Sequence, residues 1–471
     1  MNEPQVIASG KRLPQVDKIL RHAKMVERQK EIRREVLLAV TRKVLSQLRS
    51  SSSGQACDDL PSIVDRIDRE LDRLLEGSLQ KVINGTGIIL STNLGRAPLS
   101  ESISQRLGQC LAGYCNLEVE MGSGKRGERT TMVEEQLAVL TGCQSALIVN
   151  NNAAAVMLAV SALAKCKEVI VSRGELIEIG GSFRLPDVIE SAGGILKEVG
   201  TTNRTRADDY ERAISSQTGL LMKCHRSNFE ITGFTEEAPT SALVTLSRQH
   251  GITFVEDLGS GALVDLSAFN LKHEPTVMEV IAQDVDLVMF SGDKLMGGSQ
   301  AGIICGRSDL IKKLRSNPMY RALRADKLTI GLLEQVLIAY MKLNPQLQLP
   351  VLQMAVETLE SLKGRASQFM AQAQETPGDW QMKLVSSCST FGGGTLPGSD
   401  IASVSISFDL SKSSLSADKF CALLRQAPTP VIAIIQAGAV LIDFRTVSCR
   451  DQQFLLESLR WLSQQPQIKR I

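Results

Sequence analysis

The sequence predicts an α/β protein built around a mainly parallel sheet that helices cover on both faces. Between about residues 80 and 340, short apolar runs alternate with helical segments, which is the pattern of strands joined by crossover helices. Few polar residues interrupt these runs, as expected for strands that are buried on both faces. The predicted strands are residues 145–150, 168–172, 194–199, 219–224, 252–257, 286–290 and 301–306.

The segments on either side of this region differ from it. Apolar residues at helical spacing predict helices at 35–48 and 63–75, with a polar break at 51–59 between them. After a helix-rich connection at 330–375, we expect a smaller α/β unit with strands at 401–408, 430–436 and 439–445 and helices at 415–426 and 450–464. We therefore predict three domains: a helical domain at 1–78, a large α/β domain at 79–340 and a small α/β domain at 341–471.

The composition is that of a globular protein with large cores, since 43% of the 471 residues are hydrophobic and 22% are charged. With a net charge of +2, no global field draws the protein to nucleic acid or to a membrane. No apolar run reaches the roughly 18–20 residues of a membrane span, and residues 1–18 lack the apolar core of a signal peptide. We expect a cytoplasmic protein that binds neither membrane nor DNA.

Cysteine and histidine usage gives no metal-ligand pattern. The ten cysteines have scattered spacings without a C-x-x-C, and the chain has only four histidines. We expect no metal site, and we expect the cysteines to serve as small buried hydrophobic residues in a reducing compartment.

The N-terminal segment is locally basic. Residues 1–50 contain twelve Lys or Arg and five Asp or Glu, a net charge of +7. This excess is compatible with RNA binding, with a solvated helical face or with a helical contact between subunits, and by itself it does not distinguish them.

Polar side chains follow three predicted strands at their carboxyl ends, where ligands bind in open α/β sheets. Asn151 and Asn152 follow the first strand and begin an alanine-rich helix, whose free N–H groups form a seat for a phosphate. Asp257 ends the strand at 252–257, and Lys294 lies just beyond 286–290. Each has a structural alternative, namely an ordinary helix cap, a carboxylate that fixes a loop and a lysine in a surface turn.

A phosphate seat, a strand-end aspartate and a strand-end lysine, in this order, are typical of large enzymes that use pyridoxal 5′-phosphate. The lysine can form a Schiff base with this cofactor and later move a proton at the α-carbon of the substrate. The aspartate keeps a proton on the pyridine nitrogen, which makes the ring an electron sink. Ser291 and helix-terminal amides can hold the phosphate, and the chain has no G-x-x-x-x-G-K-[ST] sequence.

Seven stretches of the chain are together similar to one known family. They are VINGTGIILSTNLGRAPL (82–99), IVNNNAAAVMLAV (148–160), VSRGELIEIGGSFRLPDVI (171–189), EVGTTNRT (198–205), DLGSGALVDL (257–266), FSGDKLMGGSQAGII (290–304) and RALRADK (321–327). They resemble the bacterial selenocysteine synthases, or L-seryl-tRNA(Sec) selenium transferases, which are fold-type-I enzymes dependent on pyridoxal phosphate. The basic N-terminus and LPGSDIA (396–402) fit as well, whereas Cys224 and the loop GKRGERT (124–130) depart from the family pattern.

The resemblance implies a fold-type-I transferase with a small helical N-terminal domain. It implies that serine esterified to its tRNA becomes selenocysteine, with selenophosphate as the donor and a cofactor-bound dehydroalanyl-tRNA as the intermediate. Asp257 and Lys294 then serve the electron sink. Arg96, Arg321 and Arg324 match active-site arginines of the family, and the planar guanidinium group suits a tetrahedral oxyanion.

Three further residues keep two interpretations each. Asn228 can hydrogen-bond the 3′-oxygen of the cofactor or form a structural turn, and His225 can stack near the cofactor ring or be a core histidine. Arg445 matches an arginine that clamps the α-carboxylate of free amino acids in related enzymes. Because that carboxylate is esterified in seryl-tRNA, a structural role is favoured for Arg445.

The resemblance also implies partners. The basic N-terminal domain would bind seryl-tRNA(Sec), and the subunits would form a homodecameric ring of dimers. One alternative is a pyridoxal-phosphate lyase for a small amino acid or an amino sugar phosphate, which would need no basic helical domain. Another is a non-catalytic tRNA-binding protein, which would have no reason to keep Asp257 and a buried lysine.

Overall fold

The computed structural model describes residues 13–50, 59–180, 183–378, 380–411, 413 and 415–465. Residues 1–12 and most of the predicted polar break, 51–58, lie outside this described part. The chain divides into two compact units, Met1–Lys81 and Val82–Ile471. The division into three domains, with boundaries at 78 and 340, stays a prediction.

The first unit is helical, and its described helices pack around one apolar core. The core side chains recur at helical spacing, as Leu37, Val40 and Val44 do along one helix. Asp59 caps the last helix by accepting a hydrogen bond from the backbone N–H of Ser62. The helices are α1 (Val16–Leu20), α2 (Ala23–Arg28), α3 (Arg34–Ser50) and α4 (Leu60–Leu75), of which the sequence predicted α3 and α4.

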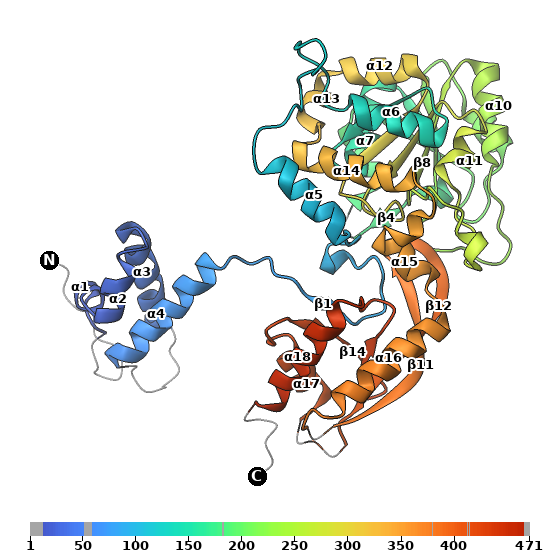
Figure 1. Ribbon diagram of the computed structural model, residues 1–471. Helices are drawn as coiled ribbons and strands as arrows, with labels where there is room; N and C mark the ends of the chain where they lie inside the picture. Colours follow the sequence, from blue (N-terminus) through green and yellow to red (C-terminus); the bar gives the residue numbers. More distant parts are fainter. Residues whose placement is uncertain are drawn as a thin grey trace. The chain divides into compact units, whose positions relative to one another are not determined.

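The second unit contains a seven-stranded sheet in which only one strand, β10, is antiparallel to its neighbours. Every strand predicted between residues 145 and 306 is present, and the ends differ by a few residues at most. The mainly parallel sheet expected from the sequence is therefore confirmed (Figure 1). In spatial order the strands are β2 (Ser145–Val149), β10 (Gly302–Gly306), β9 (Leu287–Ser291), β8 (Thr253–Gly259), β7 (Thr218–Cys224), β3 (Glu168–Ser172) and β6 (Ile195–Val199).

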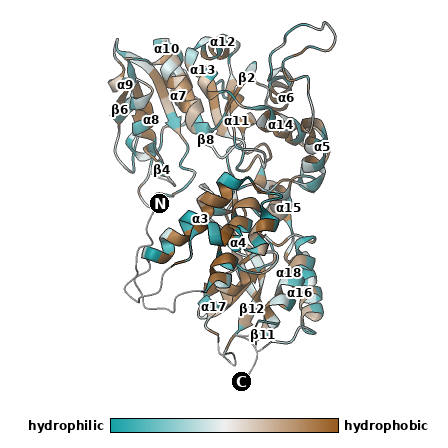
Figure 2. Cartoon of the chain, turned by 90° about the vertical axis from the view of Figure 1, so that its left-hand side faces the viewer, coloured by the Kyte–Doolittle hydropathy of each residue, from teal (hydrophilic) through white to brown (hydrophobic). Residues whose placement is uncertain are grey.

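Helices cover both faces of this sheet, because alternate strand residues point to opposite cores. Leu147 and Val149 of β2 face one core, whereas Ala146 and Ile148 face the other. The most apolar helix, α7 (Asn152–Leu163), packs centrally on the first face (Figure 2). That face also carries α8 (Leu185–Ser191), α12 (Ser308–Ser316) and α13 (Pro318–Leu323); the opposite face carries α6 (Thr131–Thr141), α10 (Thr240–His250), α11 (Val277–Ile281) and α14 (Lys327–Tyr340).

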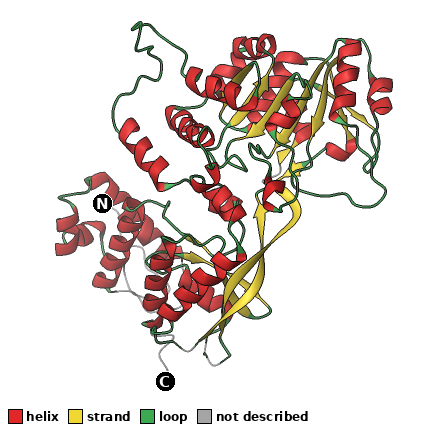
Figure 3. Cartoon of the chain, turned by 45° about the vertical axis from the view of Figure 1, so that its right-hand side comes forward, coloured by secondary structure: helices red, strands yellow, loops and turns green. Residues whose placement is uncertain are grey.

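A long two-stranded hairpin leads from the C-terminal part of the unit to the main sheet (Figure 3). Its strands, β11 (Gln381–Gly392) and β12 (Thr395–Asp409), extend far beyond the predicted strand at 401–408. With β15 (Ala439–Asp443) and β14 (Ile434–Gln436) they form an antiparallel sheet. The helices packed there are α16 (Leu359–Ala373), α17 (Ala417–Leu424) and α18 (Asp451–Ser463).

The prediction of one strand at 430–436 was wrong, because this segment forms two strands with different partners. β13 (Val431–Ile432) pairs in parallel with β1 (Ile83–Asn84), while β14 pairs with β15. The shorter remaining elements are β4 (Glu178–Ile179), β5 (Phe183–Arg184), α5 (Glu101–Leu111), α9 (Ala207–Ala213) and α15 (Pro350–Val356). Within the described residues, no helix combines the length and the apolar character that crossing a membrane requires.

Polar residues of the antiparallel sheet that contains β11 and β12 donate hydrogen bonds to one buried carboxylate. Asp443 accepts hydrogen bonds from the hydroxyl groups of four serines and from the backbone N–H of Arg445. The charge is thus solvated by the protein itself, which is a requirement for a carboxylate buried in a sheet. The four serines are Ser387, Ser389, Ser403 and Ser405.

Candidate active site

Lys294 lies in a turn directly after β9 and is almost completely buried, with 3% of its surface exposed. The turn is closed by a hydrogen bond from Gly298 N to Gly292 O and by one from Gly297 N to Lys294 O. Burial lowers the pKa of Lys294 below its usual range, while the negative charge of Asp257 opposes this and the positive charge of Arg96 adds to it. The surface-turn interpretation of this lysine is therefore wrong.

Asp257 ends up near Lys294 because β8 and β9 are adjacent parallel strands. Its Oδ1 accepts hydrogen bonds from the side chain of Asn152 at 2.8 Å and from Gly259 N at 3.0 Å. Burial raises the pKa of Asp257, whereas the Asn152 hydrogen bond and the charge of Lys294 oppose the shift. In the described part of the chain no donor reaches Oδ2, so this oxygen is available to a ligand.

Two glycines lie next to the amino group of Lys294. A Cβ atom on Gly259 or on Gly394 would lie 3.8 Å from Lys294 Nζ, and both residues have a positive φ that other residues rarely adopt. Gly394 belongs to the tip of the β11–β12 hairpin, and its carbonyl oxygen lies 3.4 Å from Lys294 Nζ. A segment one hundred residues further along the chain therefore closes this part of the site.

The predicted phosphate seat lies where β2 and β9 end and β10, between them, begins. Asn151 caps α7, since its side chain accepts a hydrogen bond from Ala154 N at 2.9 Å. Ser291 pairs with Gly302 in the sheet, and Gly302 pairs with Val149 just before the cap. A Cβ on Gly302 would come within 2.1 Å of Asn151 O, so only glycine permits this close approach. Ser291 is thus near the N-terminus of α7, as a phosphate site requires.

Several buried polar atoms around Lys294 have no hydrogen-bond partner among the described residues. They are Asn152 Oδ1, Asn228 Oδ1, Ser260 Oγ and Glu274 Oε1. Asn228 donates from Nδ2 to Glu178 O at 2.8 Å, and its Cβ lies 3.3 Å from where a Cβ on Gly394 would be. Because buried polar atoms are rarely left unpaired, this concentration indicates a polar ligand between them.

His225 follows β7 at the same edge of the sheet. Its backbone N–H donates to Asp257 O at 2.8 Å, and its Nε2 lies 3.3 Å from Glu274 Oε1. The side chain is 28% exposed, so His225 is not a fully enclosed core histidine.

Arg96 is held near Lys294 by an ion pair with Asp293, the residue before the lysine. Its guanidinium group donates to Asp293 at 2.8 Å, and Asp293 directly precedes Lys294. Arg96 adopts a left-handed φ of 61°, and Gly95 before it also has a positive φ, of 87°. Its side chain is 28% exposed and can still reach a ligand from solvent.

Arg321 and Arg324 line a separate cavity of about 380 Å³. Arg324 is anchored close to the phosphate seat, because its backbone bridges Val149 and Leu323 O accepts from Asn150 N at 2.9 Å. Among the described residues, no hydrogen bond or ion pair connects these two arginines to Lys294, Asp257 or Arg96. The cavity also contains three arginines and two carboxylates that the sequence analysis missed, namely Arg126, Arg129, Arg315, Glu118 and Glu128.

Arg445 has the structural role that its sequence context favours. It is 3% exposed, and its guanidinium group donates to the carbonyl oxygens of Met354, Glu357 and Ala402. The expectation for the cysteines was wrong in part: Cys110, Cys115, Cys166, Cys388 and Cys449 are exposed, while Cys143, Cys224, Cys305 and Cys421 are buried.

A buried carboxyl group near Asp257 was not predicted from the sequence. Glu175 is 4% exposed and accepts a hydrogen bond from Cys224 N at 2.9 Å. Burial raises its pKa to about 7. Lys223 and Glu256 are buried nearby on paired positions of β7 and β8. Only the order of the strands, which the sequence does not give, brings these groups together.

Comparison with known proteins shows which family the sequence of the chain matches. The family described as "SelA: L-seryl-tRNA selenium transferase" matches residues 82–448. The L-seryl-tRNA(Sec) selenium transferase of Geobacter sulfurreducens is 43% identical over 458 residues, covering 96% of this chain and 99% of that protein. The protein of the same name from Geotalea daltonii is 44% identical over 458 residues, covering 96% of this chain and 98% of that protein.

One solved structure supports the fold. A D-glucosaminate-6-phosphate ammonia-lyase aligns with a TM-score of 0.57 at 19% identity, over 83% of this chain and 98% of that chain. At this identity the likeness concerns the fold alone. The fold class expected from the sequence, fold type I with a mainly parallel central sheet and a helical N-terminal region, is confirmed.

Proposed function

The chain belongs to the L-seryl-tRNA selenium transferase family, and from this membership we propose that it converts L-seryl-tRNA(Sec) to L-selenocysteinyl-tRNA(Sec) with selenophosphate as the selenium donor. The observation that carries the proposal is the buried amino group of Lys294 beside the buried carboxylate of Asp257. Burial favours the neutral, nucleophilic form of a lysine, and a catalytic role would account for the cost of burying its amino group.

The residues present fit pyridoxal 5′-phosphate as the cofactor. Lys294 would hold it covalently, the free Oδ2 of Asp257 would face its ring nitrogen, and Ser291 with the N-terminus of α7 would hold its phosphate. The unpaired Oδ1 of Asn228 is an acceptor for a hydroxyl group of the ring. When bound, the cofactor would supply an electron sink for the α-carbon of the seryl group.

The proposed roles of the protein side chains follow from their environment. Lys294, once its amino group is free, would take the proton from the seryl α-carbon, because burial favours its neutral form. Arg96, Arg321 and Arg324 would bind selenophosphate through charged, forked hydrogen bonds. Arg321 suits this role, since no hydrogen bond or ion pair occupies its guanidinium group within the described residues.

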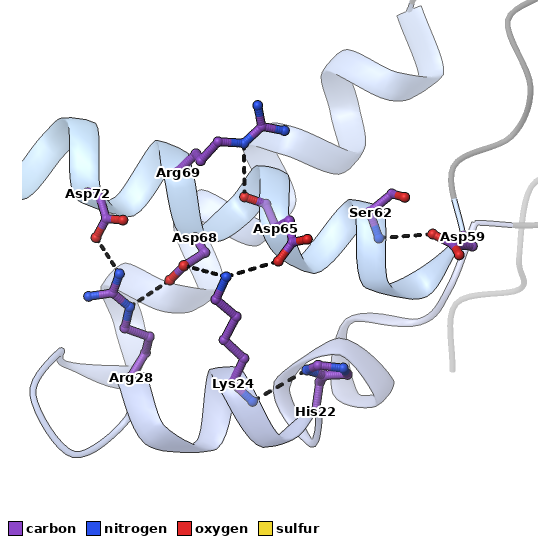
Figure 4. Close-up of polar contacts among 9 residues, drawn as sticks. All are labelled: His22, Lys24, Arg28, Asp59, Ser62, Asp65, Asp68, Arg69 and Asp72. Atoms are coloured by element: carbon purple, nitrogen blue, oxygen red, sulfur yellow. Dashed lines mark hydrogen bonds and ion pairs between the residues drawn. The ribbon is translucent and has the colours of Figure 1, made fainter. Parts of the chain in front are cut away.

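The first unit would bind the tRNA, and its ion pairs indicate which cations remain available. Lys24 and Arg28 on α2 are neutralised by Asp65, Asp68 and Asp72 on α4 (Figure 4). Burial would raise the pKa of Asp68, but hydrogen bonds from Arg28 and Lys24 outweigh it and lower the pKa. These two cations are therefore engaged in ion pairs between α2 and α4.

Other cations of the unit have no carboxylate partner in the described part of the chain. On α3 these are Arg34, Arg42 and Arg49, all exposed. Arg42 and Arg49 are seven residues apart and so lie on the same side of the helix, outside the face that packs on the core. We assign this basic side of α3 to the phosphates of the tRNA.

Two further features belong to the proposal. Because the proposed substrate is an aminoacylated tRNA, we expect the activity in the cytoplasm. The family resemblance favours a homodecamer built as a ring of dimers. The alternative, a lyase for a small amino acid or an amino sugar phosphate, is not favoured. The relatives named selenium transferase match 96% of the chain, whereas the ammonia-lyase likeness rests on 19% identity.

The direct test combines a spectrum with an activity measurement. Purified protein loaded with pyridoxal phosphate should show a visible absorption band and should form selenocysteinyl-tRNA from seryl-tRNA(Sec) and selenophosphate. Lys294→Ala should lose both while keeping a cooperative thermal unfolding transition, because the only group removed is a buried amine. A Lys294→Ala protein that forms product at the wild-type rate would sink the proposal.

A further inference from the structure

Glu274 is a buried carboxylate to which the proposed reaction assigns no function. It is 3% exposed, and in the described part of the chain its Oε1 has no hydrogen-bond donor. His225 Nε2 lies 3.3 Å from this oxygen, which is ion-pair distance, although the two groups are not aligned as a hydrogen bond. A small rotation of the imidazole would align them. A buried carboxylate oxygen without a hydrogen-bond donor is costly, so the position of Glu274 beside the His225 imidazole requires a reason.

The loop that carries Glu274, residues 270–276, is fixed at several points. Thr276 bridges Ala262 just beyond β8, and Val277 N donates to Ala262 O at 3.0 Å. Lys272 donates to Pro397 O at 3.3 Å near the hairpin tip. The loop is therefore held by the exit of β8 on one side and by the hairpin on the other.

The backbone of His225 is held at two points. The backbone N–H of His225 donates to Asp257 O at 2.8 Å, and the carbonyl of His225 accepts from Ser227 N at 2.8 Å. The charge of Glu274 also acts on Lys294, because it opposes the burial that lowers the lysine pKa. His225 thus contacts Asp257, and Glu274 lies close enough to Lys294 for its charge to act on the lysine.

We propose that Glu274 is a positioning residue that fixes His225 as a second proton donor beside Lys294. A carboxylate next to Nε2 keeps a proton on that nitrogen and determines the orientation of the ring, as the third member of a nucleophile–base–orienter set does. The Nδ1 atom is then the one that exchanges protons with the substrate. This inference rests on the proposed selenium transfer.

The role of His225 follows from the protons that move when the seryl hydroxyl group is eliminated. When the seryl hydroxyl leaves, the Cβ–O bond breaks and its electron pair goes to oxygen, while the pair of the Cα–H bond becomes the second Cα–Cβ bond. Lys294 has then gained the α-proton, and the leaving oxygen needs another proton to depart as water. The protonated imidazole of His225 donates it from Nδ1 and becomes neutral, with Glu274 balancing the positive charge beforehand.

The test compares two carboxylates that each face a histidine. Glu274→Gln removes the charge at His225, whereas Glu279→Gln is the matched control, since Glu279 lies 3.6 Å from the exposed His273 in the same region. Full-length protein labelled in histidine is examined by NMR for a downfield proton on imidazole Nε2, assigned through its loss in His225→Asn. We expect this resonance in the wild type and in Glu279→Gln and its absence from Glu274→Gln.

Kinetics on the same proteins provide the second measurement. We expect Glu274→Gln to lower kcat by about 10²-fold or more with the KM for seryl-tRNA unchanged, because only proton donation is impaired. Glu274→Asp, which keeps the charge, should recover part of kcat. Wild-type kcat in Glu274→Gln, or a change in KM alone, would overturn the role of Glu274.

The inference and the proposed function fail separately. A wild-type protein that forms no selenocysteinyl-tRNA contradicts the proposed function. An active wild type without the His225 resonance contradicts the inference, and this comparison needs no variant of Glu274. It therefore decides the question even if Glu274→Gln does not fold.

Discussion

The side-chain amide of Asn152, at the start of α7, donates a hydrogen bond of 2.8 Å to the carboxylate of Asp257, at the end of β8. The two residues are 105 positions apart in the sequence. They meet because β2 and β8 point the same way in the sheet, so that the residues after each strand lie at the same edge. Asn152 therefore connects the phosphate seat to the carboxylate expected to face the cofactor ring.

Asn152→Ala should lower the affinity of the protein for pyridoxal phosphate without unfolding it. A hydrogen bond to a charged group contributes about 1.5–3 kcal/mol, which corresponds to about 10–100-fold in affinity. The dissociation constant of the cofactor, measured from the visible band during dilution or competition, should rise by this factor. An unchanged constant would mean that Asp257 is held in place by its Gly259 contact alone.

Glu175 predicts a distinctive dependence of stability on pH. Burial raises its pKa from 4.5 to about 7, so between these values the folded protein holds a proton that the unfolded chain has lost. The free energy of unfolding therefore falls as the pH rises through this window, by about 3 kcal/mol from this group. Glu175→Gln can still accept the hydrogen bond from Cys224 N but cannot titrate.

Denaturant unfolding of both proteins at pH 4, 6 and 8 measures this difference. Relative to the wild type, Glu175→Gln should gain stability from pH 4 to pH 8, with most of the gain complete shortly above pH 7. Parallel stability curves for the two proteins would show that the pKa of Glu175 is the same in the folded and unfolded states, contrary to the effect of its burial.

The residues predicted from the sequence are those that directly follow apolar strands. Asp257 and Lys294 were found because a long apolar run followed by a polar residue marks a strand end, and parallel strands bring such ends together. Gly394 was not found, because the preceding strand β11 contains the polar run SSCST (386–390) and lacks the continuous apolar pattern of a buried strand. Its serines point to Asp443, a partner that only the folded sheet provides.

Glu274 and Arg129 were missed for a related reason. Both lie in segments without regular structure, where the sequence carries no periodic signal. Their positions depend on contacts between distant residues, such as Thr276 with Ala262 and Arg129 with Ala325 O. Sequence pattern predicts residues attached to regular elements, whereas residues placed by loop contacts need the structure.

Arg321 and Arg324 should affect the selenium donor more than the tRNA. We expect Arg321→Ala and Arg324→Ala to keep the visible band and to raise the selenophosphate concentration needed for half-maximal rate by about 10–100-fold, since each removes a charged hydrogen bond. Arg321→Lys should restore only part of the loss, because an ammonium group lacks the forked geometry. The measurement titrates selenophosphate at saturating seryl-tRNA(Sec). If the two variants change only the affinity for tRNA, the cavity lined by Arg321 and Arg324 binds RNA and not the selenium donor.

Arg42 and Arg49 should contribute to tRNA affinity through phosphate contacts. Replacing either with alanine removes an exposed charge that has no carboxylate partner among the described residues, so the fold of the first unit should be unaffected. Each lost phosphate contact should reduce the slope of log affinity against log salt by about 0.7–0.9. Lys24→Ala is the contrasting variant, because Lys24 already pairs with Asp65 and Asp68 and its loss should change thermal stability rather than the slope. Binding of seryl-tRNA(Sec) measured from low to high salt distinguishes the two cases. If Arg42→Ala and Arg49→Ala keep the wild-type slope while Lys24→Ala reduces it, the RNA lies on the α2 side of the unit and the assignment to α3 is wrong.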